Sequence, residues 1–577
     1  MGYGASFPDF RGVEGRTTIG PTILAVAAGL ALGGCYSGVS AEATVPLGEA
    51  DSATEGTGGE DGDEDTSGGG SDLPMPEADC PGPDQPRRLN RTELNNIALD
   101  VLGVNSEPFA GLTTSGDVAG SKVGHRLVVS DAWVDTYISG ADEAALAYVQ
   151  REGLAAQCEG LGAECTRPLL EPVAFALLRR PVSEARMDGL VGIVQTALDN
   201  DLSLEDGIVS ALTAVFISPE FLYIGTNVGA EPGVYALDGY DVATRLALAL
   251  WNSGPDLELL AAAQRGDLDT SEGIRTQVDR MLADPDKGPR FIDGWANTYL
   301  FLSKLDDAGV DVPEGSGFTP QEWTGLLADM KTEAVTAMRH AFETGEDIDF
   351  LVDPGVVFVN DRLAAHYGIE GVEGEEFRMV EVGPDTPYGG LLTMGHNLIA
   401  NDDLIHRGVS VLNDYLCQPI GAPSDEETLA RIAEQLESGL SDEELVGIRM
   451  NDPACAGCHV AIDPLGTAFA RFDALGRHHL LDEDGAPISN EQEYYGQPVV
   501  GPQSVRELVL ESGYEMCFVP ALLGPLANRE MRAHDTADAC ATESLLESVD
   551  GDLNLRNIVV AALTSGTFRT RVVGEEE

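Results

Sequence analysis

The residues with the clearest chemical potential form the run Cys455-Ala456-Gly457-Cys458-His459. Two thiols three residues apart can add to the two vinyl groups of a haem, and the adjacent imidazole can then bind the iron. We therefore predict that Cys455 and Cys458 carry a covalently attached haem c and that His459 is the proximal iron ligand. Pro464 is expected to join the site, with its carbonyl oxygen accepting the other imidazole N–H and fixing the ring.

Three other uses of a Cys-x-x-Cys pair stay open. A redox dithiol of the thioredoxin type needs a βαβ setting, which the hydrophobic pattern lacks. A zinc site needs a second Cys/His pair of comparable spacing, and none is found. A disulfide across so short a loop adds little stability. Haem attachment is favoured because it takes place outside the cytoplasm, where the N-terminus is expected to direct the chain.

The pattern leaves the ligand on the other face of the iron undecided. Met516 lies 57 residues after His459, a separation at which a distal methionine often occurs in small c-type cytochromes. The other candidates are Met531, Met394, His396 and His406. A methionine would raise the reduction potential and suit electron transfer, and a second histidine would lower it. An open position would permit peroxide or oxygen chemistry.

The chain has nine cysteines, of which six remain once Cys35 and the motif pair are set aside. In an oxidising compartment we expect disulfides among them. Cys158–Cys165 is the first choice because it closes a short glycine-rich loop. Cys517–Cys540 would join two C-terminal helices and leave Cys80–Cys417 by elimination. Alternatively, one or two of the six stay as buried thiols.

Residues 1–34 are predicted to be a lipoprotein signal peptide. A largely apolar run over residues 19–32 is shorter than the roughly 20 residues needed to span a bilayer. It ends at Leu32-Gly33-Gly34-Cys35, which has the pattern of a bacterial lipobox. We predict lipidation of Cys35 and export to the outer membrane or cell surface, with the periplasmic side as an alternative. An ordinary signal peptide with an incidental cysteine is the competing interpretation.

Residues 35–79 are predicted to be an acidic disordered linker, because residues 36–79 contain many Asp and Glu but neither Lys nor Arg. The whole chain has 34 Lys and Arg against 97 Asp and Glu, a net charge of −63. Such a charge repels phosphate backbones and disfavours nucleic acid as a partner. The expected partners are the membrane, through lipidated Cys35, and a redox partner protein or a small-molecule substrate.

The segments that surround and position the motif are predicted to be mainly helical. The longest amphipathic stretch is Pro320–Phe342, and Pro464 is expected to open a helix that reaches Arg471. One hairpin is expected over Arg477–Val500, turning at Asp484-Gly485. We predict a mainly α fold of several helical units, the C-terminal one carrying the c-type haem motif, behind an N-terminal disordered tether. The expected regions are an N-terminal helical region (80–232), a central helical domain (233–384), a haem-bearing c-type block (385–500) and a C-terminal helical domain (501–577).

On these residues the chain resembles the multi-domain, cytochrome-c-linked family of planctomycetes and myxobacteria, which is built from recurring domains of unknown function. The resemblance covers most of residues 87–573 and is most specific at Cys455–Arg477 (CAGCHVAIDPLGTAFARFDALGR). The other matching blocks are Arg87–Asn96, Phe175–Pro181, Tyr240–Asp256, Val278–Pro285, Gly390–Gly395, Arg407-Gly408, Leu416-Cys417 and Ala562–Arg571. The resemblance implies a secreted or surface haem protein.

The motif and the N-terminus together predict a lipid-anchored mono-haem c-type protein of the cell envelope that transfers electrons. Two alternatives stay open. One is a haem-dependent oxidoreductase acting on an organic or polymeric substrate bound by the helical region. The other is a surface binding lipoprotein in which the haem is structural. The pattern does not decide whether the protein is an enzyme.

Overall fold

The computed structural model describes part of the chain, and all described residues belong to the second of two compact units, Thr66–Glu577. The described ranges are 87–112, 130–225, 232–305, 312–313, 316–383, 386–421, 423, 429–433, 439–440, 442–453, 455–482, 484–526, 536–549 and 551–573. The predicted signal peptide, Cys35, the acidic linker, Cys80 and Met531 lie outside these residues.

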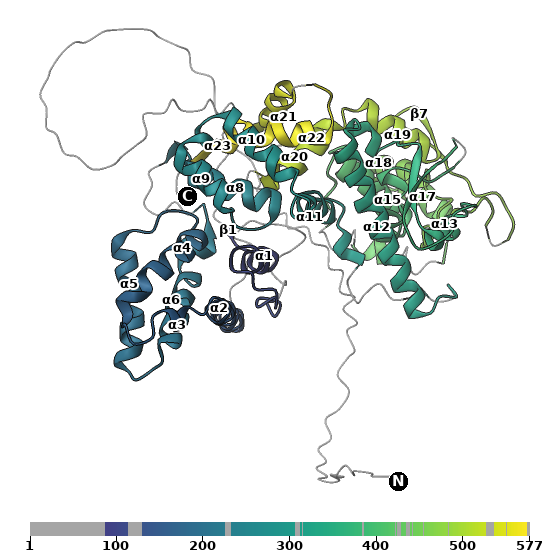
Figure 1. Ribbon diagram of the computed structural model, residues 1–577. Coiled ribbons are helices and arrows are strands. Elements are labelled where there is room, and N and C mark those ends of the chain that lie inside the picture. Colours follow the sequence, from purple (N-terminus) through teal and green to yellow (C-terminus); the bar gives the residue numbers. More distant parts are fainter. Residues whose placement is uncertain are drawn as a thin grey trace, which may run out of the picture. The chain divides into compact units, whose positions relative to one another are not determined.

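The first described region is the group of helices coloured purple to blue in Figure 1. These helices surround an apolar core that includes Leu94, Val194 and Phe216. Its helices are α1 (Arg91–Leu102), α2 (Asp131–Glu152), α3 (Leu154–Gln157), η3 (Ala163–Thr166), α4 (Arg167–Leu178), α5 (Glu184–Asp199), α6 (Leu204–Phe216) and α7 (Pro219–Leu222). Antiparallel pairing of β1 (Arg87–Arg88) with β2 (Tyr223–Ile224) brings its two ends together.

Local chemistry explains where α1 begins. The Asn90 side chain accepts from the Glu93 backbone N–H, and the Glu93 carboxylate accepts from the Asn90 backbone N–H, which is a capping box. Glu93 is fully buried and also pairs with Arg87, whose two terminal nitrogens lie 2.8 and 2.9 Å from its carboxylate oxygens. The buried charge is therefore compensated on both sides.

The second region begins with β3 (Gly233–Ala236) and continues mainly as helices. Its further elements are α8 (Gly239–Trp251), α9 (Leu257–Arg265), η4 (Asp267–Asp269), α10 (Ser271–Leu282), α11 (Pro289–Tyr299), η5 (Leu302–Leu305), α12 (Pro320–Thr344), η6 (Ile348–Leu351), β4 (Val356–Val359), α13 (Asp361–Tyr367) and β5 (Arg378–Glu381). The long helix expected from Pro320 is α12, which starts at a capping box formed by Thr319 and Glu322. Strands β4 and β5 pair antiparallel.

The third region contains the Cys-x-x-Cys-His motif. Its elements are η7 (Leu391–Thr393), α14 (Gly395–Ala400), α15 (Leu404–Ser410), η8 (Val411–Tyr415), α17 (Asp442–Asn451), α18 (Ala456–Thr467), β6 (Glu491–Tyr494), β7 (Gln497–Val500), α19 (Gly501–Glu511), α20 (Glu515–Leu526), α21 (Thr536–Ser548), α22 (Leu555–Thr564), α23 (Gly566–Arg569) and β8 (Thr570–Val573). Among them η8 is a single turn of π-helix that continues α15.

One apolar core connects the second and third regions. It includes Trp251 from α8, Leu465 from the motif helix α18, and Phe518 from α20. The pairing of β3 with β8, in which Gly233 lies opposite Val573, further joins these regions. The described strands form only two-stranded pairings, so the prediction of a mainly α fold is confirmed.

The structure corrects the position of the predicted hairpin turn. The regular hairpin is β6–β7, and its turn is Tyr495-Gly496, with φ values of 47° and 83°. Positive φ at both central residues suits the twist of a two-residue hairpin loop. The expected turn at Asp484-Gly485 lies earlier, where a single bridge joins Leu481 and Pro487.

Among the described residues, no helix has both the length and the apolar character that a membrane crossing would require.

Candidate functional site

The motif cysteines lie at the start of α18. The Asp452 carbonyl oxygen accepts from the backbone N–H of Cys455 at 3.0 Å and of Ala456 at 2.8 Å, so a tight turn joins α17 to α18. Cys455 is buried, Cys458 is exposed, and both are free thiols. The two sulfur atoms therefore lie on one helical turn. That of Cys455 is on the core side, and that of Cys458 is on the solvent side.

The imidazole of His459 is held by a carboxylate four residues later. Its Nδ1 lies 2.8 Å from Oδ1 of Asp463, which is fully buried. A carboxylate accepts, so Nδ1 carries the proton and Nε2 keeps its lone pair. Within the described part of the chain, no group hydrogen-bonds Nε2 of His459. This ring is therefore oriented and in the tautomer that a metal ligand requires.

Arg449, on α17, completes the arrangement. Its Nε donates to Oδ2 of Asp463 at 3.1 Å, and both side chains are buried. The carboxylate of Asp463 thus bridges an imidazole and a guanidinium inside the protein. A buried ion needs such compensation, because removing one partner leaves the other charge unpaired.

Pro464 does not open a helix, in contrast to the prediction. It lies inside α18, which runs continuously from Ala456 to Thr467. Because the helix already begins at Ala456, His459 and Asp463 lie on one face at a spacing of four residues, and Asp463 binds Nδ1 in place of the Pro464 carbonyl. The His-x-x-x-Asp spacing was visible in the sequence, whereas nothing local connected Arg449 with it.

Two glycines allow α18 to lie directly against α15. A Cβ atom on Gly466 would stand 2.0 Å from the carbonyl oxygen of Leu404, and one on Gly408 would stand 2.2 Å from that of Ile462. Real Cβ atoms do not approach backbone this closely, so only glycine fits at either position. The backbone of α18 is therefore anchored by contacts on its buried side.

Arg407 fixes the chain that follows α18. Its guanidinium is buried and donates to five carbonyl oxygens, those of Leu398, Asn401, Phe469, Phe472 and Asp473. A planar fork of donors can serve acceptors from two segments at once. The Arg407-Gly408 pair thus positions the motif helix in two ways. The Arg407 side chain hydrogen-bonds the segment that follows α18, and the lack of a side chain on Gly408 lets α15 lie directly against α18.

The candidate distal ligands lie on several elements. Met516 is half-buried on α20, Met394 and His396 are buried at the start of α14, and His406 is exposed on α15. Met531 lies outside the described residues. None of the described candidates hydrogen-bonds His459.

One disulfide prediction is confirmed, and the predicted pairs Cys517–Cys540 and Cys80–Cys417 are both wrong. Cys158 pairs with Cys165, as expected from the short loop between them. Cys517 pairs with Cys417, not with Cys540, and this bridge joins α20 to the segment that directly follows η8. Cys540 is also disulfide-bonded. The correct pairing depends on which helices pack together, and spacing along the chain does not reveal that.

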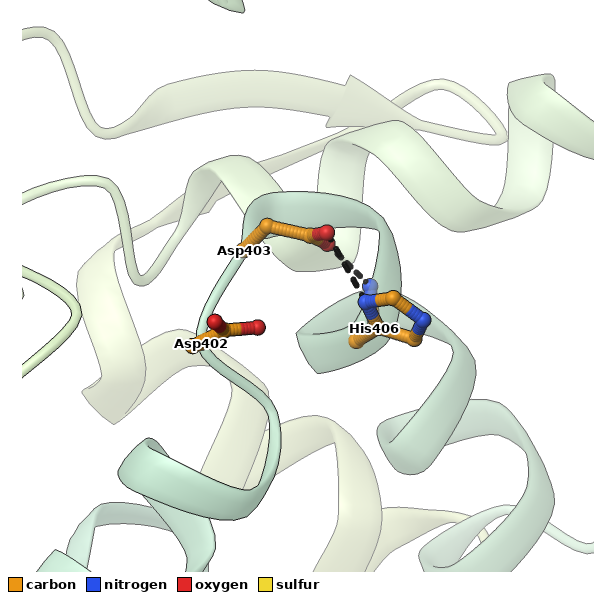
Figure 2. Close-up of side chains that lie close together, drawn as sticks. All are labelled: Asp402, Asp403 and His406. Atoms are coloured by element: carbon orange, nitrogen blue, oxygen red, sulfur yellow. Dashed lines mark hydrogen bonds and ion pairs between the residues drawn. The ribbon is translucent and has the colours of Figure 1, made fainter. Parts of the chain in front are cut away.

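Asp402, Asp403 and His406 form a cluster whose ligand-type atoms all lie within 4.8 Å of one another (Figure 2). Asp403 precedes α15, and its carboxylate accepts from the backbone N–H of His406 and binds Nδ1 of that ring at 2.8 Å. The hydrogen bond to Asp403 raises the pKa of His406. All three residues are exposed, and the contacts between Asp403 and His406 are those of an ordinary helix N-cap.

A buried polar cluster that the sequence did not reveal lies between α12, α13 and α14. The Tyr367 hydroxyl donates to Glu333 Oε2 at 2.6 Å and accepts from the Gly395 backbone N–H at 2.7 Å. Burial raises the pKa of Glu333 to about 8. Burial also lowers the pKa of the neighbouring His396 to about 3, and its Nδ1 has no hydrogen-bond partner among the described residues.

Three segments of the chain match known family models. Residues 165–225 match PSD5, residues 237–369 match PSD4 and residues 388–482 match PSCyt3, described as proteins of unknown function (DUF1595, DUF1592 and DUF1588, in that order). The last segment contains α14, α15 and α18 with the Cys-x-x-Cys-His motif. No curated protein and no solved structure matches the chain. The chain therefore combines three recurring domains of unknown function, as in a multi-domain family built from such domains.

Proposed function

We propose that the protein is a mono-haem c-type protein of the cell envelope that transfers electrons. Cys455 and Cys458 would hold the haem through thioether bonds, and His459 would bind the iron through Nε2. The bound haem supplies one-electron chemistry at the iron. The protein's own residues supply two thiols, an oriented imidazole and a helix anchored to the core.

The state of the cysteines is the observation that carries this proposal. Among the described residues, all other cysteines are in disulfides, and only Cys455 and Cys458 are free. Free thiols beside an imidazole whose Nε2 has no hydrogen-bond partner in the described part of the chain form the donor set that haem attachment requires. The site therefore fits the group.

The alternatives for this motif have less support. A zinc site would need further Cys, His or carboxylate ligands near the two thiols. In the described part of the chain, the one group of residues that could hold a metal ion is Asp402, Asp403 and His406, and neither cysteine belongs to it. The motif also lies on a helix of a mainly α region, without the βαβ setting of a thioredoxin-like dithiol.

We further propose that Cys35 is lipidated and tethers the folded part to the membrane through the acidic linker. The lipobox pattern supports the anchor, and the many Asp and Glu without Lys or Arg in residues 36–79 support an extended linker. Labelling of the protein by a radioactive or clickable fatty acid is expected, and Cys35→Ala should abolish the label. A Cys35→Ala variant that is still labelled and membrane-bound would contradict the anchor.

Covalent haem is tested by expression in a host that has the c-type maturation machinery. The purified protein should be heavier than its polypeptide by one haem, about 616 Da. When reduced it should absorb at about 550 nm, and this absorbance should survive acid–acetone extraction. The double variant Cys455→Ala, Cys458→Ala should be colourless. The matched control, Cys158→Ala with Cys165→Ala, removes as many sulfur atoms and should keep its haem. Colourless wild-type protein would overturn the proposal.

Carbon monoxide then separates electron transfer from the oxidoreductase alternative. Reduced iron with two protein ligands resists carbon monoxide, so an unchanged spectrum supports an electron-transfer role. Rapid binding would show an open position and favour turnover of a small molecule.

A further inference from the structure

The imidazole that would bind the iron donates to a buried carboxylate that also pairs with Arg449, and not to a backbone carbonyl. We infer that Asp463 is a positioning residue that strengthens His459 as an iron ligand and lowers the reduction potential of the haem, and that Arg449 moderates this effect. This inference rests on the proposed function.

The contact between His459 and Asp463 supports the first part of the inference, that Asp463 strengthens His459 as an iron ligand. Nδ1 and Oδ1 are 2.8 Å apart, and the carboxylate is fully buried, so water does not compete for it. A hydrogen bond to an ionised acceptor is shorter and roughly twice as strong as one to a neutral acceptor. The proton on Nδ1 is drawn toward Asp463, and the ring gains negative character at Nε2. A more basic Nε2 stabilises ferric iron over ferrous iron.

The contact between Arg449 and Asp463 supports the second part of the inference, that Arg449 moderates this effect. Its Nε donates to the other carboxylate oxygen at 3.1 Å, and the exposed fractions of the two side chains are 6% and 0%. The guanidinium compensates the carboxylate in the core and also draws part of its charge away from His459. The basicity of His459 is therefore set by a balance between two donors that share one carboxylate.

The helix geometry shows why a carboxylate takes this role. Because α18 begins at Ala456, before His459, the residue one turn after His459 is Asp463, and its side chain reaches back to Nδ1. Arg449 reaches the same carboxylate from the preceding helix, which the turn at Asp452 folds back onto α18. Both contacts are made between residues of the chain itself, and together they fix the orientation of the imidazole.

The test compares midpoint potentials of haem-loaded variants at one pH. Asp463→Asn should favour the reduced state at least tenfold, which is a positive shift of about 59 mV or more for a one-electron couple. Arg449→Gln keeps a donor but removes the cation, and it should shift the potential in the negative direction. In the Asp463→Asn background, the effect of Arg449→Gln should shrink, because the shared carboxylate is gone.

Asp452→Asn is the matched control for charge. It removes one acidic group next to the motif, where Asp452 pairs with Arg431 and not with His459, and its shift should be clearly smaller. The Nδ1 proton resonance of the reduced protein should also move upfield in Asp463→Asn. Should that variant fail to fold, the double variant Asp463→Asn, Arg449→Gln buries a neutral pair and should still show a raised potential.

The possible failures are distinguishable. Wild-type protein without covalent haem overturns the proposed function, and this inference with it. Haem-loaded Asp463→Asn with an unchanged potential, or with the same shift as Asp452→Asn, overturns the inference alone.

Discussion

Gly466 on α18 lies against Leu404 on α15 so closely that a Cβ atom on the glycine would stand 2.0 Å from the Leu404 carbonyl oxygen. The motif helix is therefore held by direct backbone contact. Any side chain at this position must push the two helices apart or distort one of them.

We expect Gly466→Ala to lower the free energy of unfolding by about 1–3 kcal/mol or more, since overpacking a tight contact strains the backbone. Thermal unfolding followed by circular dichroism measures the loss. Gly447→Ala on α17 is the control, because nothing lies within 4 Å of its Cβ position. The control should gain up to about 1 kcal/mol from the higher helix propensity of alanine. Equal effects of the two substitutions would argue against the close approach.

Arg407→Lys should be destabilising by about 3 kcal/mol, although it keeps the charge. One ammonium group cannot replace the guanidinium, which donates to five carbonyl oxygens before and after the motif helix in the sequence. Each hydrogen bond to a charged group contributes about 1.5–3 kcal/mol to stability. Urea unfolding gives the value. The same exchange at exposed Arg180 should stay within about 0.5 kcal/mol. A tolerated Arg407→Lys would show that charge alone suffices.

The stability of the protein should fall as the pH rises from about 6.5 to about 8. Below that range buried His396, whose pKa is lowered from 6.5 to about 3, opposes the effect of Glu333, because the unfolded chain binds a proton that the folded state excludes. The pKa of Glu333 is 4.5 in its unperturbed state and is raised by burial to about 8 in the fold. The folded state therefore holds a proton that the unfolded chain has released. Its stabilising contribution is complete below pH 4.5 and is lost by up to about 1.4 kcal/mol per pH unit as the pH approaches 8.

Glu333→Gln should remove that pH dependence, because the amide keeps an acceptor for the Tyr367 hydroxyl and cannot ionise. Melting temperatures from pH 5 to pH 9 should diverge from those of the wild type at the alkaline end. Glu343→Gln, on the exposed face of the same helix, should follow the wild type throughout. Parallel curves for Glu333→Gln and the wild type would mean that Glu333 ionises normally in the fold.

The Cys417–Cys517 bridge should stabilise the protein more than Cys158–Cys165. The two bridges link residues 100 and 7 positions apart, respectively. Loop-closure entropy assigns about 4.7 kcal/mol to the longer loop and about 2.5 kcal/mol to the shorter one. Denaturant unfolding of the two paired Cys→Ala variants measures the difference. A larger loss for the short loop would contradict the chain-entropy account.

The helices and the motif follow from the sequence by itself, because both are local. Apolar spacing and capping residues such as Thr319 and Glu322 determine α12 without reference to the rest of the chain. The Cys158–Cys165 bridge is local in the same sense, as its partners are 7 residues apart. The Cys-x-x-Cys-His motif is also local, because all of the residues that predict its chemistry lie within five positions.

The tertiary structure alone decided which distant residues meet. Cys517 pairs with Cys417 because α20 packs near the end of η8, and β3 pairs with β8 across more than 300 residues. Arg449 reaches Asp463 only because the chain turns back at Asp452. Such contacts depend on the packing of whole helices in one core, and periodicity along the chain carries no information about which helices become neighbours.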